Sequence, residues 1–253
     1  MLDGLQSIDQ LYPKFVAAVG MTEHKRYIGK KKSELANFLE KVEKTPISQR
    51  KEGTGRLLFS MDATASREKT WDHACHIQGE MFRATSRIGG LNIQLCYYRG
   101  FNQFNSSPWT GSETELVHEM SKVRCLGGHT QIEKILNHAL KEHRNRRINA
   151  LVFVGDAIEE DSDKLCFIAG KLGVLNIPVF VFQEGINPLA MNTFRQIAEL
   201  SGGAYAPFNS NSAEELKNLL AAVAVYAAGG REALEKFEKE NLSGKMLTVQ
   251  IGK

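Results

Sequence analysis

Short, mostly apolar runs of five residues alternate along this chain with longer segments that have helical character. The short runs are 57–61, 150–154 and 178–182. Runs of this length and composition are typical of strands buried on both faces. The segments expected to be helical are 66–87, 113–124, 130–140, 163–175 and 191–200. Alternating strands and helices of these lengths predict a parallel sheet covered by helices on both faces.

Three further segments complete the predicted sheet. Residues 93–98 are rich in strand-favouring side chains, and the turn after them lets 101–104 return as an antiparallel edge strand. Residues 204–208 form a short last strand, in which Pro207 indicates an edge position. The expected fold class is α/β, with a Rossmann-like, doubly wound, mostly parallel sheet, one antiparallel edge strand, and helices on both faces.

The pattern divides the chain into three parts. Residues 1–55 are expected to be a helical N-terminal arm and linker. Residues 56–230 hold the alternating strands and helices, and a capping box at 212–215 opens their last helix. Residues 231–253 are expected to be a C-terminal extension with a charged helix and a tail strand at 246–251.

The composition of the chain says more about its possible partners and its compartment than about its fold. The 253 residues carry a net charge of +3, too little to predict a nucleic-acid or membrane partner, and no apolar run is long enough to span a bilayer. Acidic residues interrupt any leader-like apolar segment at the N-terminus, and the four cysteines are scattered without a paired motif. These features favour a cytoplasmic protein with free thiols. The oligomeric state stays open.

Polar residues follow two of the predicted strands and open one helix. Asp62, Thr64 and Ser66 come after the first strand, and Asp156 comes after the run at 150–154. Thr130 opens a helix two residues after a pair of glycines, in the sequence Gly127-Gly128-His129-Thr130. In doubly wound sheets, ligands bind beyond the carboxyl ends of the strands, so these three loops are expected to converge.

Two carboxylates and three hydroxyls are a ligand set for a small, hard cation. Mg²⁺ prefers octahedral oxygen ligation and keeps several waters, while Mn²⁺ and Ca²⁺ are possible substitutes. Because the set contains few carboxylates, the ion stays under-neutralised and can accept an oxygen from outside, typically a carboxylate.

These residues resemble the metal-ion-dependent adhesion site of von Willebrand factor A (VWA) domains. The likeness rests on Asp62-x-Thr64-x-Ser66, on the Gly-rich helix start with Thr130, and on Asp156, and it covers roughly residues 56–230. The chain departs from the usual family pattern at Thr64, where Ser is commoner, and in the Gly-Asp-Ala sequence around Asp156. Neither departure removes a ligand oxygen.

The resemblance implies a binding module rather than an enzyme. It implies that Asp62, Thr64, Ser66, Thr130 and Asp156 ligate the metal, and that a partner protein completes the shell with an Asp or Glu. It also implies a place in an intracellular multiprotein complex and a movement of the last helix, about 213–228, when the partner docks.

Three alternatives remain. A phosphotransferase of the haloacid-dehalogenase kind would use Asp62 and imitate its later acidic pair with Asp156 and Asp161, but it needs a general acid where this chain has Thr64. An ordinary α/β domain would use Ser66 and Thr130 only to cap helices. His73 and His76 invite a zinc site, but no second ligand pair at metal spacing accompanies them.

Overall fold

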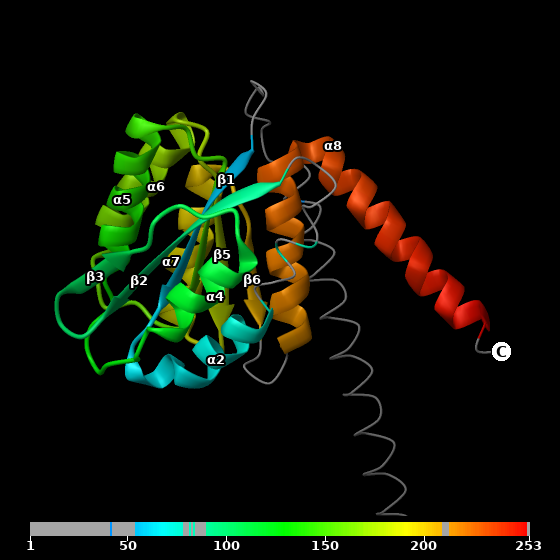
Figure 1. Cartoon of the computed structure of the whole chain (residues 1–253). Coiled ribbons are helices and arrows are strands. Elements are labelled where there is room, and N and C mark those ends of the chain that lie inside the picture. The colour runs from blue at the N-terminus through cyan, green and yellow to red at the C-terminus, as the bar shows by residue number, and fades with distance from the viewer. Residues whose placement is uncertain are drawn as a thin grey trace, which may run out of the picture. The chain divides into compact units, whose positions relative to one another are not determined.

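Five parallel strands and one antiparallel edge strand form a single sheet in the part of the chain that the structure describes. The structure is a computed structural model, and it describes residues 41, 54–77, 81, 83, 90–208 and 213–251 (Figure 1). The expected N-terminal arm, residues 1–55, lies outside this part, except for Lys41, Thr54 and Gly55, and Gly55 already belongs to the first strand. The strands are β1 (Gly55–Asp62), β2 (Leu91–Arg99), β3 (Gln103–Ser106), β4 (Ala150–Gly155), β5 (Val179–Glu184) and β6 (Tyr205–Phe208).

The sheet has the strand order β3-β2-β1-β4-β5-β6. Strand β3 pairs with β2 in antiparallel register, and all other neighbours are parallel. This confirms the mostly parallel, doubly wound sheet with one antiparallel edge strand. The chain order reverses between β1 and β4, so the carboxyl ends of these two strands mark the switch point at which ligands bind in such sheets.

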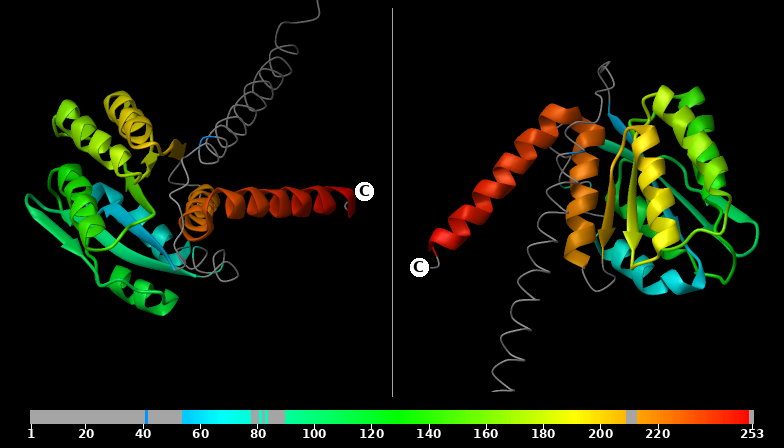
Figure 2. Two further views of the ribbon diagram at one scale, coloured as in Figure 1. Left: turned by 90° about the horizontal axis from the view of Figure 1, so that it is seen from above. Right: turned by 180° about the vertical axis from the view of Figure 1, so that it is seen from behind.

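Helices cover both faces of the sheet, as expected. The helices are α2 (Glu68–Ile77), α4 (Glu113–Ser121), α5 (Ile132–Asn145), α6 (Ser162–Val174), α7 (Pro188–Ser201) and α8 (Ala213–Ile251), with a 3-10 turn, η1 (Ala65–Arg67), before α2. Helices α5, α6 and α7 pack side by side on one face, and α2, α4 and the first part of α8 lie on the other (Figure 2).

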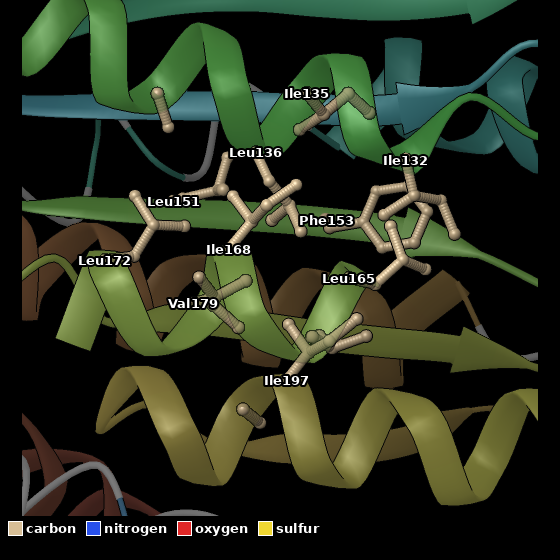
Figure 3. Packing of buried hydrophobic residues seen from close by; sticks show 14 of the residues in the cluster. Ile132, Ile135, Leu136, Leu151, Phe153, Leu165, Ile168, Leu172, Val179 and Ile197 are labelled. Atoms are coloured by element: carbon tan, nitrogen blue, oxygen red, sulfur yellow. The ribbon is translucent and has the colours of Figure 1, made fainter. Parts of the chain in front are cut away.

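The core between the sheet and α5, α6 and α7 is built from the apolar runs found in the sequence. Leu151, Phe153 and Val179 from the strands meet Ile135 of α5 and Ile168 of α6, and all five are at most 5% exposed (Figure 3). Each such side chain contributes about 1.5–3 kcal/mol when it leaves water. The strands that carry the candidate ligands are therefore fixed firmly.

The sequence prediction was wrong for the tail. Residues 246–251 belong to α8, which runs to Ile251, and not to a strand. A lone strand needs a neighbour for its hydrogen bonds, whereas a helix satisfies its own backbone. Helix α8 is bent at Gly230, where the backbone has φ 69° and ψ −165°. The antiparallel edge strand was placed two residues too early, because the turn extends to Asn102.

Candidate metal site

The polar residues after β1 lie at the switch point and make hydrogen bonds to one another. The Asp62 carboxylate is 1% exposed, and its Oδ1 accepts a hydrogen bond of 2.7 Å from the Thr64 N–H. The hydroxyls of Thr64 and Ser66 are 3.4 Å apart. Ser66 also donates to Asp156 Oδ2 at 3.3 Å, across the gap between β1 and β4. The structure thus brings together four of the five predicted ligands.

Thr130 is anchored to a different partner. Its hydroxyl accepts a 2.9 Å hydrogen bond from the Glu159 N–H, and its own N–H donates to Glu159 Oε2 at 3.0 Å. Glu159 lies three residues after Asp156, so Thr130 is tied to the loop that carries the second carboxylate. No hydrogen bond within the described ranges joins Thr130 to the other four residues.

The hydroxyls do not serve as helix caps, which counts against the capping alternative. Thr64 precedes η1 but its side chain makes no capping hydrogen bond, and Ser66 lies inside that turn. Helix α5 begins two residues later than predicted, at Ile132. The carboxylate of Glu160 caps it by accepting hydrogen bonds of 2.8 Å from the N–H groups of Ile132 and Glu133.

One carboxylate oxygen at the site lacks a partner. Asp62 Oδ2 is buried and receives no hydrogen bond of ordinary geometry from any residue that the structure describes. Burial raises the pKa of Asp62, the nearby Asp156 charge adds to this, and the Thr64 N–H opposes it. An unsatisfied buried carboxylate oxygen is costly for the protein alone, but it is suited to ligate a cation.

Two further polar groups were not predicted from the sequence. Tyr98 stands opposite Asp62 in the pairing of β1 with β2, and its hydroxyl is buried without a partner of ordinary hydrogen-bond geometry. Burial, together with the negative charge and hydrogen-bonding influence of Asp62, raises the pKa of Tyr98 well above its usual value. Arg67, directly after Ser66, is 1% exposed, and its Nη1 lies 3.9 Å from Asp156 Oδ2.

The donor set fits a hard cation better than zinc. Within the described residues, no group of three or more His, Cys, Asp or Glu side chains is placed to hold a metal. The side chains of His73 and His76 lie outside this part of the structure. The candidate site instead combines two carboxylates with hydroxyls that do not cap helices, and oxygen ligands of this kind suit Mg²⁺. Asp62, Thr64, Ser66 and Asp156 would hold such an ion, with Thr130 beside them.

In the structure, Asp161 does not take the place of the second acidic residue that the phosphotransferase alternative requires. Asp161 caps α6, because its Oδ1 accepts hydrogen bonds from Asp163 N–H at 2.9 Å and Lys164 N–H at 3.2 Å. Thr64 stands where the general acid would be needed, and its hydroxyl faces Ser66. The structure therefore does not favour this chemistry.

No helix among the described residues has both the length and the apolar character needed to cross a membrane. In the part of the chain that the structure describes, none of the four cysteines forms a disulfide bond.

Comparison with solved structures identifies the fold. No protein-family model and no curated protein sequence matches the chain. The VWA domain of SpRpn10 matches with TM-score 0.53 and 14% identity, over 66% of this chain and 94% of that one. Mussel byssus PTMP1, with a zinc-occupied MIDAS (metal-ion-dependent adhesion site) motif, matches with TM-score 0.54 and 13% identity, over 68% of this chain and 46% of that one. The PilB minor pilin of Streptococcus sanguinis matches with TM-score 0.56 and 9% identity, over 76% and 64%.

The chain thus corresponds to less than half of PTMP1 and to nearly the whole SpRpn10 domain. These identities are too low to transfer a function, so the likeness concerns the fold alone. The part of the chain that the structure describes has the fold of a von Willebrand factor A domain.

Proposed function

We propose that this chain is a metal-dependent protein-binding module, which docks an acidic residue of a partner protein on a divalent cation. The cation is Mg²⁺ or, as a substitute, Mn²⁺ or Ca²⁺, and its ligands are Asp62, Thr64, Ser66, Thr130 and Asp156. The observation that carries the proposal is the buried, unpartnered Asp62 Oδ2 beside hydroxyls that do not cap helices.

The charge balance at the site explains why the partner group is acidic. Two carboxylates balance one divalent ion only formally, and the neutral hydroxyls add no charge. Arg67 lies 3.9 Å from Asp156 Oδ2, but its own charge is balanced by its ion pair with Glu184. A bound ion is therefore not over-neutralised, and a carboxylate from a partner can supply a further charged oxygen ligand.

The surface next to the site supports protein binding. Phe101, after β2, is 75% exposed, and its ring meets that of His129 edge-on at 5.2 Å between centroids. Leu126 is 41% exposed, and its N–H donates to the carbonyl of Ala63, between two of the candidate ligands. Exposed apolar side chains beside a polar site are typical of protein-interaction surfaces.

The proposal includes no catalytic role. It places the protein in the cytoplasm, in a multiprotein complex, as composition and the VWA resemblance suggest. The fold of SpRpn10 and PTMP1 is compatible with an interaction module. Residues 1–55 and 231–253 are candidates for further partner contacts.

Thermal unfolding tests the metal site. The chain is stripped with EDTA and then titrated with Mg²⁺, Mn²⁺ and Ca²⁺, alongside Asp62→Asn. At a free ion concentration of 100 times the dissociation constant, the ion stabilises the wild type by about 2.7 kcal/mol. A gain of this size raises Tm by roughly 5–10 °C for a domain of this size. Asp72→Asn, which removes an exposed carboxylate on α2, is the matched control and retains the response.

A second measurement tests the docking step. Binding of acidic peptides is measured by calorimetry with Mg²⁺ and with EDTA, for the wild type and for Phe101→Ala. Metal-dependent binding that weakens in Phe101→Ala supports the proposal. A wild-type chain whose Tm responds to none of the three ions contradicts it.

A further inference from the structure

A buried cation already lies beside the candidate metal site. Arg67 follows the last residue of the Asp62-x-Thr64-x-Ser66 motif and is 1% exposed. A guanidinium stays charged at all ordinary pH values. Its Nε and Nη2 are buried without a hydrogen-bond partner among the described residues. Burying a charged group with unsatisfied donors is costly, so its placement calls for a physical explanation.

Arg67 lies near two carboxylates, Glu184 and Asp156, of which only Asp156 is a candidate metal ligand. Its Nη1 forms an ion pair with Glu184 Oε2, and the Thr70 hydroxyl donates to the same oxygen. The other carboxylate is Asp156, a candidate metal ligand, whose Oδ2 is 3.9 Å from Nη1. That separation is too long for a hydrogen bond. The guanidinium is therefore bound to Glu184 and only near Asp156.

The sheet fixes this geometry. Glu184 is the last residue of β5, and Asp156 directly follows β4, which pairs with β5 in parallel register from Leu151–Val179 to Gly155–Gln183. Both carboxylates thus leave the sheet at the same edge. Arg67 comes from η1, at the end of the neighbouring β1. A small rotation of its side chain decides which carboxylate it contacts.

We propose that Glu184, supported by Thr70, holds Arg67 away from Asp156 and thereby keeps Asp156 available to the divalent cation. Arg67, Glu184 and Thr70 are positioning residues in this arrangement. The inference rests on the proposed metal site. If Glu184 loses its charge, the donors of Arg67 that lack partners turn to the nearest carboxylate, which is Asp156, and the guanidinium competes with the metal.

The Glu184–Arg67 pair therefore sets the metal affinity of the site without contacting the metal. A guanidinium hydrogen-bonded to Asp156 would neutralise that carboxylate and occupy its lone pairs. Removal of outer partners of this kind typically weakens metal binding about 10–100-fold.

Calorimetric titration with Mg²⁺ tests the inference in four chains: wild type, Glu184→Gln, Arg67→Gln, and the double variant Arg67→Gln with Glu184→Gln. We expect Glu184→Gln to weaken Mg²⁺ binding by at least about tenfold. The double variant lacks the competing guanidinium and is expected to recover to within about threefold of the wild type, or to bind more tightly. Arg67→Gln alone is expected not to weaken binding.

Rescue in the double variant is the decisive readout, because a purely structural role of Glu184 gives no recovery of affinity when Arg67 is also removed. Unfolding in EDTA shows which variants fold. Thr70→Val is a milder second perturbation that weakens binding in the same direction, and it keeps the test valid if Glu184→Gln does not fold.

The two proposals fail in different ways. A wild-type chain that binds no Mg²⁺ overturns the proposed function and this inference with it. A wild-type chain that binds Mg²⁺ while Glu184→Gln and Thr70→Val bind equally well overturns only the role of Arg67 and Glu184. A double variant that binds Mg²⁺ as weakly as Glu184→Gln also overturns only the role of Arg67 and Glu184.

Discussion

The close approach of two backbone segments beside the site gives a sharp prediction for Gly128→Ala. A Cβ at Gly128 would lie 2.0 Å from the carbonyl oxygen of Gly100, 2.1 Å from its carbon and 2.5 Å from its Cα. All three atoms belong to the backbone, so no side-chain rotation relieves the contact. Ordinary contacts of carbon are about 3.5–4.0 Å, so the loop before α5 must move away from the β2–β3 turn by more than about 1 Å.

The magnitude follows from this overlap. Forcing extra volume into a closed contact costs about 1–3 kcal/mol, which lowers Tm by roughly 2–12 °C for a chain of this size. The displaced loop carries Thr130, so a weaker metal response is expected as well, since ligand distances tolerate only about 0.2 Å.

Gly127→Ala is the matched control for this prediction. The same methyl group at Gly127 would have no atom within 4 Å, and the residue has no left-handed φ. Differential scanning calorimetry in EDTA, followed by Mg²⁺ titration, compares the two variants with the wild type. Equal Tm values for Gly127→Ala and Gly128→Ala would refute the reasoning, because the contact with Gly100 would then cost nothing.

Three other outcomes follow from burial and charge. Metal affinity should fall as pH is lowered towards the raised pKa of Asp62, because protons and metal compete for the same carboxylate, and the fall should begin at higher pH than for an ordinary Asp. Calorimetry between pH 4.5 and 8 checks this, and a flat profile would contradict it. Because this folded-state pKa is raised, the metal-free chain loses stability as pH rises through it, so Asp62→Asn in EDTA should be at least as stable as the wild type at pH 7. Phe153→Ala should cost about 3–5 kcal/mol by denaturant unfolding, since Phe153 is 1% exposed and packs on Tyr98 and Phe194; a loss below 1 kcal/mol would count against this packing.

Local sequence patterns were sufficient to predict the strands of the sheet but not the helical structure of residues 246–251. The apolar runs of β1, β4 and β5 are determined by burial on both faces, which leaves a clear signature in five consecutive residues. Strand-favouring residues at 246–251 were misleading, because strand propensity depends on a neighbouring strand and that segment continues α8. The candidate ligands at the ends of β1 and β4 lie close together because parallel pairing places both strand ends at one edge of the sheet.

The electrostatic surroundings of the site could not be derived from local spacing. Arg67 and Glu184 are 117 positions apart, and nothing in either segment indicates the other. Two signals were available in retrospect: an arginine directly after the motif, and a glutamate that ends an otherwise mostly apolar strand. The acidic residues after Asp156 illustrate this, because Asp161 caps its own helix α6, whereas Glu160 caps α5.

The contact between the start of β1 and helix α8 restricts how that helix can move. A Cβ at Gly55 would lie 2.4 Å from the carbonyl oxygen of Ala227 and 2.6 Å from the Cα of Ala228, so strand and helix touch through their backbones at the end of the sheet opposite the candidate site. A shift of α8 by one turn, about 5.4 Å, would bring Val223 or Arg231 to this point, and neither has a side chain small enough. The partner docking proposed above would therefore be able to tilt α8 about its contact with Gly55, but not to slide the helix along its axis while that contact persists.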